Sequence, residues 1–373
     1  MSLFRRKQKG YLGIDFGAGG IKVIQLKPAG GRGGLFTYGF SEQSVEETGV
    51  EYLDQPDKAG ELLKAICTKA KTTTVNAVAA LPIPAVFSAV LSIGAVPKKE
   101  ILQAVQWEAK KLIPLPLEDV VLDYKELSTT PSPMPIGRQA SLNKEGKKGE
   151  EEKEEKKEKS MQILLTAAPK GIIDKYVAIA KQAGLTLVSL ETEAFALIRS
   201  LIGSDPTPSV IVDIGAVRSN ILIIDQGIPM LTRSIEVGGK NCTQAIAKSL
   251  GMDAIQAESM KRDLGSGTLS RESSQSVLPM LQEILQPLVN ELKYSLNVYR
   301  TRNNNARPVE RIIISGGGSG IPGLVEFFTQ EFNLRSFVGN PWEKVNFHPD
   351  LNPLLQTFGS RFAVAIGLAL RNL

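Results

Sequence analysis

The sequence has few of the side chains that build metal centres, disulfide frameworks and hydrolytic triads. Its 373 residues include only two cysteines, Cys67 and Cys242, and one histidine, His348. The cysteines lie far apart in different predicted segments, which argues against a disulfide framework or a zinc site and fits a reducing cytoplasm. The histidine stands in a turn-like stretch, so no Ser/His/Asp or Cys/His constellation can be assembled around it.

A strong net charge and a P-loop are also missing. The formal charge of +5 is small for this length, and no compact basic stripe carries interleaved aromatic residues, so nucleic acid is not an expected partner. No GxxxxGK sequence followed by Ser or Thr occurs, which excludes a P-loop enzyme.

Residues 1–10 lack the apolar core of a signal peptide. A frayed tail is the favoured interpretation, although Leu3 and Phe4 beside basic residues could touch an anionic membrane.

An uncharged run at residues 75–96 is long enough to mimic a membrane span. Pro82 and Pro84 fall near its middle, where two missing backbone donors would break a helix that no water could repair. We therefore expect two short strands here and no direct membrane span.

Two stretches share one plan, in which an apolar strand leads into Asp-x-Gly, a turn and a second strand. They are residues 210–227, with Asp213 and Gly215 and a turn expected at 216–220, and residues 11–26, with Asp15 and Gly17. Each stretch alone is also typical of an ordinary β-hairpin. A carboxylate at the exit of a buried strand, followed by exposed backbone N–H groups, suits metal-bound phosphate. The repetition predicts two pseudo-symmetric lobes that clamp one ligand.

A third glycine-rich element follows the predicted strand 311–315. Residues 318–323 formally match the dinucleotide fingerprint GxGxxG, between a strand and a helix expected at 324–332. No compact βαβ unit with a downstream ribose-binding acid follows, so a Rossmann site is not favoured. Glycines can instead let the backbone pass close to a flat nucleoside.

Hydrophobic periodicity predicts the elements between these motifs. Residues 128–160 are instead polar and rich in charges of both signs, which predicts a disordered insert. Strands are expected at 35–40, 76–81, 87–95, 120–127, 161–168 and 185–190, and helices at 57–70, 101–112, 171–183, 191–202, 243–250, 255–263, 278–302 and 361–371, with Pro287 kinking or starting the helix at 278–302.

The three glycine elements, at 13–22, 213–219 and 316–319, resemble the phosphate 1, phosphate 2 and adenosine motifs of the actin, heat-shock chaperone and sugar-kinase superfamily. More narrowly, residues 80–87 and 100–116 with Asp123-Tyr124 look like the PilM family of actin-like type IV pilus assembly proteins. Residues 166–170 and 183–185 with Glu191 agree with that resemblance.

The resemblance implies an α/β, two-lobed actin-like fold, a duplicated ribonuclease H-like ATPase fold, with an extra subdomain like subdomain 1C of FtsA. Lobe I would comprise residues 11–83 and 169–205 with the C-terminal helix 361–373. Lobe II would comprise residues 209–241 and 311–360. The helical subdomain would be residues 242–310, and the extra subdomain would be residues 84–168.

The resemblance also implies ATP and Mg²⁺ in the cleft between the lobes. Asp15 and Asp213 would hold Mg²⁺ through water, and Lys22 would neutralise phosphate. The other residues expected at the nucleotide are Gly17, Ala18, Gly19, Gly20, Gly215, Ala216, Ser219, Gly238, Gly239, Lys240, Glu258, Lys261, Arg262, Gly316, Gly317, Gly318 and Ser319; among them Glu258 and Lys261 would bind the ribose hydroxyls.

Two features bear on catalysis. Ala18 stands where relatives often place Ser or Thr, so one hydroxyl donor to phosphate is missing, whereas Ser219 keeps the hydroxyl of the second turn.

The acid that orients water would lie near the start of the predicted helix 191–202. We take Glu191 as the candidate, with Glu193 left open beside it; either could instead be a helix-capping charge.

Three interpretations of the function are considered beside the resemblance. The first is an ATP-binding scaffold that binds the cytoplasmic tail of PilN near the extra subdomain. It would also contact other pilus platform and motor proteins. Through these partners it would lie at the inner face of the cytoplasmic membrane. Whether it forms homo-oligomers is left open. The second is an active ATPase or a small-molecule kinase; a filament-forming relative of the division protein FtsA is a third interpretation.

Overall fold

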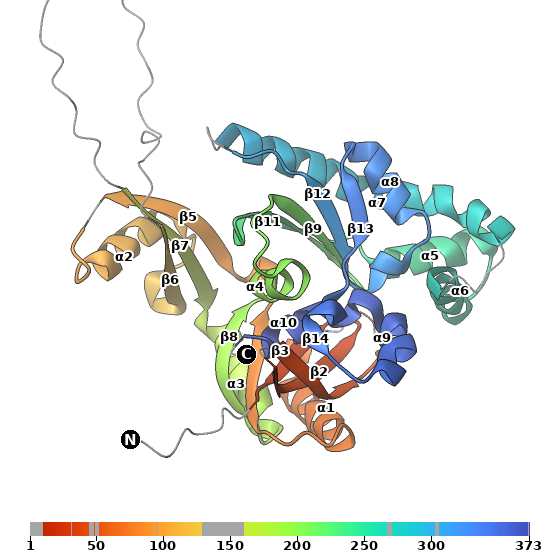
Figure 1. Ribbon diagram of the computed structural model, residues 1–373, viewed down its shortest axis with the longest axis horizontal. Coiled ribbons are helices and arrows are strands. Elements are labelled where there is room, and N and C mark those ends of the chain that lie inside the picture. Colours follow the sequence, from red (N-terminus) through yellow and green to blue (C-terminus); the bar gives the residue numbers. More distant parts are fainter. Residues whose placement is uncertain are drawn as a thin grey trace, which may run out of the picture. The chain divides into compact units, whose positions relative to one another are not determined.

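The computed structural model describes residues 10–30, 32–44, 48, 52–94, 96–128, 160–266, 271–302, 306–371 and 373. Nearly all of the N-terminal tail and of the predicted insert at 128–160 therefore lie outside the described residues. The chain divides into two compact units, a large one of Met1–Val86 with Gly171–Leu373 and a small one of Phe87–Lys170 (Figure 1).

The first sheet of the large unit has the strand order β14-β3-β2-β1-β4-β8. β1 and β2 form an antiparallel hairpin, and β4 runs parallel to β1. The strands are β1 (Leu12–Gly17), β2 (Gly20–Ala29), β3 (Arg32–Phe40), β4 (Asn76–Leu81), β8 (Thr186–Thr192) and β14 (Val345–Asn346), and the helices connected to them are α1 (Pro56–Lys69), α3 (Lys170–Gln182), α4 (Glu193–Leu197), a π-helical turn (Ile198–Ile202) and α10 (Ala363–Ala369).

The second sheet repeats the arrangement of the first. β9 and β10 form an antiparallel hairpin, and β12 runs parallel to β9, as β4 does to β1. The order is β11-β10-β9-β12-β13, with β9 (Ser209–Ile214), β10 (Ser219–Asp225), β11 (Ile228–Ile235), β12 (Arg311–Ser315) and β13 (Arg335–Val338). The predicted pair of Asp-bearing hairpins is thus confirmed. One continuous apolar cluster includes β4, β9 and β10 together with α4 and α10, so it joins the two sheets.

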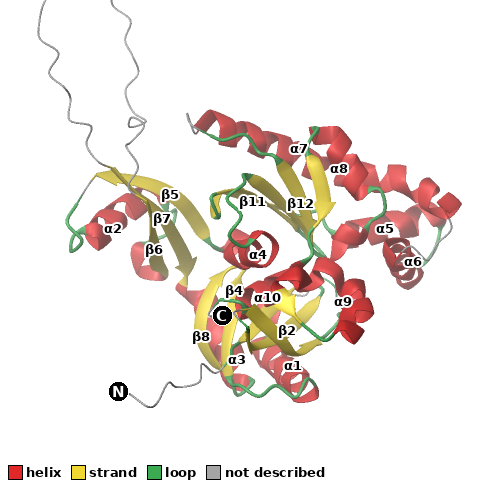
Figure 2. Ribbon diagram, in the orientation of Figure 1, coloured by secondary structure: helices red, strands yellow, loops and turns green. Residues whose placement is uncertain are grey.

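Helices also pack on the second sheet (Figure 2). They are α5 (Gly239–Leu250), α6 (Ala254–Ser266), α7 (Arg271–Arg302) and α8 (Leu324–Phe332). The predicted start of α7 at residue 278 is wrong, because the helix begins at Arg271 and contains both Pro279 and Pro287. Leu281, Leu285 and Leu292 are buried along it, and this apolar stripe supports the helix where the prolines remove backbone donors.

The C-terminal helix is shorter than predicted. A 3-10 turn covers Gly359–Phe362, and α10 begins only at Ala363. All seven residues of α10 are buried. The helix approaches β1 closely because Gly13 has no side chain; a Cβ there would lie 2.1 Å from the carbonyl oxygen of Ala365.

In its described residues, the small unit is a three-stranded antiparallel sheet with one α-helix. Its order is β5-β7-β6, with β5 (Phe87–Gly94), β6 (Val120–Ser128), β7 (Ser160–Pro169) and α2 (Ile101–Leu112). Ile101, Val105 and Ala109 of α2 are buried in its core, whereas Leu102 and Leu112 are exposed. Residues 75–96 contain the two predicted strands, β4 and β5, and none of the described helices is long and apolar enough to cross a membrane.

We predict that Gly13→Ala destabilises the protein by about 2 kcal/mol or more, because the new methyl group would collide with the backbone of α10 rather than with a movable side chain. Urea unfolding followed by circular dichroism measures the loss. Gly171→Ala is the matched control, since a Cβ at this position in α3 meets nothing within 4 Å. Equal midpoints for the two variants would contradict the close packing of β1 on α10.

Candidate functional site

Asp15 and Asp213 occupy equivalent places in the two hairpins. Asp15, in β1, is paired in register with Lys22 of β2, and the Lys22 Nζ lies 3.0 Å from its Oδ2. Asp213, in β9, lies opposite Asn220 and Ser315 on its two neighbouring strands. Burial and the negative charge of Asp15 raise the pKa of Asp213 to about 6, against the opposing effects of Ser315 and Lys22. Asp15 and Lys22 therefore face the same space as Asp213.

A third carboxylate, that of Glu193, enters this space from the start of α4. Its Oε2 accepts hydrogen bonds from the backbone N–H of Ile83 at 3.1 Å and from the Asn220 Nδ2 at 3.3 Å. Burial, followed by the charge of Asp15 and then that of Asp213, raises its pKa to about 8, while the Ile83 N–H works in the opposite direction. A carboxyl group with this pKa is protonated at neutral pH.

Glu191, our candidate for the water-orienting acid, is not brought to this cluster. Its two carboxylate oxygens lie 2.7 and 3.0 Å from the guanidinium of Arg199, and Arg371 lies 3.8 Å away. The sequence did not separate it from Glu193, because the choice depends on where the strand stops. β8 continues through Glu191 to Thr192, and the helix starts at Glu193.

The first glycine turn connects the paired residues Gly17 and Gly20 through Ala18 and Gly19. Gly20 has a φ of +140°, and a Cβ there would lie 1.9 Å from the carbonyl oxygen of Ser41. The turn is therefore lined by backbone and one methyl group, and it offers N–H groups without a hydroxyl donor.

The second turn comprises Gly215–Arg218 and ends earlier than predicted, since Ser219 and Asn220 already belong to β10. The N–H of Gly215 donates to the Arg218 carbonyl at 2.9 Å. The Ser219 hydroxyl is fully buried and donates to the Val237 carbonyl at 2.6 Å, so the structure does not direct it toward a ligand.

Gly238 and Gly239 pack against the backbone of the second turn. The N–H groups of Gly239 and Lys240 donate to the carbonyls of Gly215 and Ala216, at 2.9 and 2.7 Å. A Cβ on Gly238 would lie within 2.9 Å of backbone atoms in this turn. The glycine pair thus fixes the turn at the start of α5.

The two turns also approach each other. A Cβ built on Gly19 would lie 3.2 Å from the Cβ of Ala216. Small residues on both sides therefore allow the backbones of the first and second turns to border one narrow space.

The bend at Gly316–Gly318 lies against the end of β9. Gly316 has a φ of +85°, and a Cβ on it would lie 2.4 Å from the Ile214 carbonyl and 2.9 Å from the Asp213 Oδ1. The Ser319 hydroxyl donates to the Gly316 carbonyl at 2.8 Å and lies 2.8 Å from the Ser360 hydroxyl. Ser319 therefore shapes the bend instead of pointing outward.

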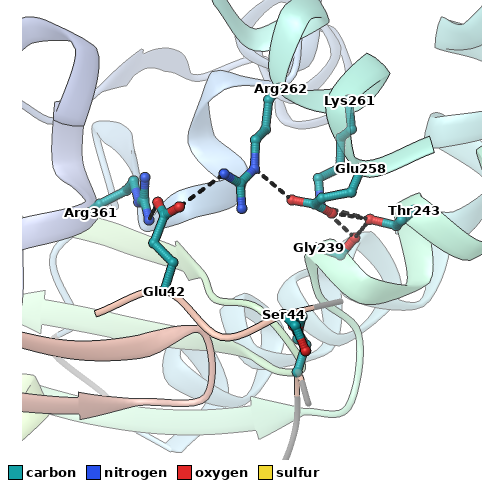
Figure 3. Close-up of polar contacts among 9 residues, drawn as sticks. Glu42, Ser44, Gly239, Thr243, Glu258, Lys261, Arg262 and Arg361 are labelled. Atoms are coloured by element: carbon teal, nitrogen blue, oxygen red, sulfur yellow. Dashed lines mark hydrogen bonds and ion pairs between the residues drawn. The ribbon is translucent and has the colours of Figure 1, made fainter. Parts of the chain in front are cut away.

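Glu258, Lys261 and Arg262 gather on α6 (Figure 3). The Glu258 Oε2 lies 2.6 Å from both the Lys261 Nζ and the Thr243 hydroxyl, and its Oε1 lies 3.0 Å from the Arg262 Nε. Burial raises the pKa of Glu258, but the charge and hydrogen bond of Lys261 and its other donors hold it below its usual value. Lys240 turns away from this cluster and donates to the Thr48 carbonyl at 2.7 Å.

The residues around Asp15 and Asp213 fit a magnesium–nucleotide complex. Mg²⁺ usually keeps several waters and is held by one or two carboxylates together with substrate phosphates. The side-chain oxygen of Asn220, buried beside Asp213, accepts no hydrogen bond from any described residue. Within the described ranges, no group of three or more His, Cys, Asp or Glu side chains is arranged to bind a metal ion directly.

A family model described as type IV pilus assembly protein PilM matches residues 13–135 and 151–373. The chain belongs to the PilM family. A solved structure of a PilM–PilN type IV pilus biogenesis complex has 27% identity and a TM-score of 0.77, covering 97% of this chain and 98% of that chain.

Two more distant structures share the fold of this PilM family member. The ethanolamine utilization protein EutJ from Carboxydothermus hydrogenoformans has 15% identity and a TM-score of 0.53, covering 96% of this chain and 89% of that one. MreB5 of Spiroplasma citri bound to ADP has 14% identity and a TM-score of 0.50, covering 97% and 95%. The predicted family and the predicted two-lobed actin-like fold are both confirmed.

We predict that the ligand-free protein loses stability as the pH rises from about 4.5 to about 8, because folded Glu193 keeps a proton that the unfolded chain releases. Glu193→Gln mimics the protonated form and removes most of this loss, roughly 2–5 kcal/mol. Asp213→Asn removes the smaller contribution of Asp213, which is confined to the range below about pH 6, and leaves the loss due to Glu193. Melting temperatures measured without Mg²⁺ across this range test the prediction, and an unchanged pH slope in Glu193→Gln would contradict it.

Proposed function

We propose that this PilM family member is an ATP-binding scaffold of the type IV pilus assembly platform. The observation that carries the proposal is the meeting of Asp15 and Asp213, from two equivalent hairpins, beside the glycine bend at Gly316. Actin-like folds place a nucleotide between two such hairpins, and the donor set on this chain is suited to one.

In this proposal Asp15 and Asp213 hold Mg²⁺ through water, and Lys22 neutralises phosphate. Backbone N–H groups of the turns at 17–20 and 215–218 surround the phosphates, while Gly316–Gly318 face the adenine and ribose. Glu258 and Lys261, about one-fifth exposed, bind the ribose hydroxyls. The bound Mg²⁺ would supply charge neutralisation between the acids and the phosphates.

Slow hydrolysis is a second candidate activity, favoured by the place of Glu193. Its carboxyl group lies next to both metal-binding acids, where it could orient a water molecule near the terminal phosphate. With a pKa of about 8 the Glu193 carboxyl group is mostly protonated at neutral pH, so only a small fraction of molecules carry the charged base until a bound cation lowers that pKa. A scaffold that hydrolyses ATP slowly is therefore better supported than a fast ATPase or a kinase.

The cytoplasmic tail of a PilN-like protein is the proposed partner, supported by the similarity to the PilM–PilN complex. The small unit offers a suitable surface, because Leu102, Trp107, Leu115 and Val121 are exposed apolar residues within 20 positions. Lys111 lies beside Trp107, with its Nζ 5.8 Å from the ring centroid. Through this partner and other platform and motor proteins, the protein would lie at the inner face of the cytoplasmic membrane.

We predict that Asp213→Ala weakens Mg²⁺-dependent ATP binding by at least about tenfold, because one of the two metal-binding carboxylates is lost. Isothermal titration calorimetry of the full chain measures the affinity. Asp225→Ala is the matched control, since Asp225 lies at the far end of the neighbouring strand and binds Arg307 and Tyr299 instead. Equal ATP affinity in the two variants would reject Asp213 as a metal-binding residue. Separately, ATP turnover by the unmodified protein well above about 1 per second would favour an active ATPase over a scaffold.

We predict that Trp107→Ala weakens capture of a PilN-tail peptide by about tenfold, because an exposed tryptophan is a frequent anchor in protein interfaces. Fluorescence anisotropy of a labelled peptide reports the affinity. Val177→Ala, which shortens an exposed apolar residue on α3 outside the small unit, is the control. Unchanged peptide affinity in Trp107→Ala would exclude this face of α2 as the docking surface.

A further inference from the structure

Glu42 follows β3 and is held against the first glycine turn. The backbone N–H of Ser41 donates to the Ile21 carbonyl at 2.9 Å, and that of Gln43 donates to the Gly19 carbonyl at 3.3 Å. The Ile21 N–H in turn donates a hydrogen bond to the Ser41 hydroxyl oxygen at 3.0 Å. Because these bonds lie on both sides of Glu42, its backbone position follows the position of the turn.

The Glu42 carboxylate joins two arginines from other parts of the chain (Figure 3). Its Oε1 lies 2.8 Å from an Nη of Arg361, and its Oε2 lies 3.1 Å from an Nη of Arg262. Burial raises the pKa of Glu42, but the hydrogen bonds and positive charges of both arginines outweigh burial and hold the pKa below its usual value. The carboxylate is therefore charged at neutral pH and balances two guanidinium groups.

Each arginine is connected to an element proposed to hold the nucleoside. Arg262 lies on α6 and binds Glu258, the carboxylate proposed for the ribose. Arg361 follows Ser360, whose hydroxyl contacts Ser319, and its side chain borders Gly317 of the glycine bend. The contacts thus run from the phosphate turn through Glu42 to both nucleoside elements.

We propose that Glu42 is a positioning residue that couples the first glycine turn to α6 and to the glycine bend, and so slows the escape of a bound nucleotide. The inference rests on the proposed nucleotide site. The three side chains are between about one-third and one-half exposed. Their attraction is therefore screened by salt, and it limits the rate of opening rather than the encounter with ligand.

The test measures Mg²⁺-dependent dissociation of a fluorescent ATP analogue from the full chain by stopped flow. In Glu42→Gln we expect the dissociation rate to rise roughly three- to fivefold while the association rate stays within about twofold. Added salt should speed dissociation from the unmodified protein more than from this variant. Glu331→Gln is the matched control, because it removes a similarly exposed ion pair, with Lys293, that is unconnected to the turn.

A double-mutant cycle tests whether Glu42 acts through Arg262 or whether each substitution destabilises the site independently. If Glu42 acts through Arg262, the rate increases of Glu42→Gln and Arg262→Gln are not additive when combined. Hydrogen exchange without ligand adds a readout independent of nucleotide: exchange in α6 should rise in Glu42→Gln and stay unchanged in Glu331→Gln.

The outcomes separate the two proposals. If the unmodified protein binds the analogue but Glu42→Gln matches it in dissociation rate and in α6 exchange, the role of Glu42 is overturned and the nucleotide site stands. If the unmodified protein does not bind the analogue with Mg²⁺, the proposed function fails and the role of Glu42 fails with it.

Discussion

Two carboxylates that repel each other, Asp15 and Asp213, are held facing one space, and the rest of the large unit serves to keep them there. They are almost 200 positions apart in sequence, and each is fixed by backbone pairing within its own sheet. The apolar cluster that joins α4, α10 and both sheets brings the two hairpins together. Burial and then the charge of Asp15 raise the pKa of Asp213, which reflects the free-energy cost of holding both carboxylates in this buried space.

Small residues make the approach of the two hairpins feasible. Gly19 and Ala216 leave almost no side-chain volume between the turns, and Gly316 lets the third element lie against the Asp213 carboxylate. The backbone N–H groups of both turns thus border the space between the acids, as does the Lys22 ammonium, which lies 3.0 Å from the Asp15 carboxylate. A phosphate chain with its magnesium ion would satisfy these donors and offset the repulsion between the carboxylates.

Much of this architecture was predictable from local patterns. The Asp-x-Gly hairpins, the strands around them and the glycine bend depend on short apolar runs and on glycine, which are visible in the sequence. Boundaries were less predictable. The second turn ends two residues before its predicted end, and α7 begins seven residues before its predicted start, because tertiary packing decides where an element begins and ends.

The choice between Glu191 and Glu193 and the contacts of Glu42 were beyond the reach of sequence patterns. Glu191 and Glu193 differ by one strand period, so only the end of β8 shows which of them meets the acids. Glu42 meets Arg262 and Arg361 across 220 and 319 positions of sequence, and no local motif marks such a contact. Residues that join separate parts of a fold carry little signal in the segments that contain them.

Anomalous diffraction from crystals grown with ATP and Mn²⁺ in place of Mg²⁺ would locate the metal directly. If Asp15 and Asp213 hold it together, one manganese peak lies between the two hairpins, joined to each carboxylate through no more than one water. A metal–nucleotide complex bound elsewhere on the protein, or a peak at this position that neither carboxylate reaches, would contradict this assignment.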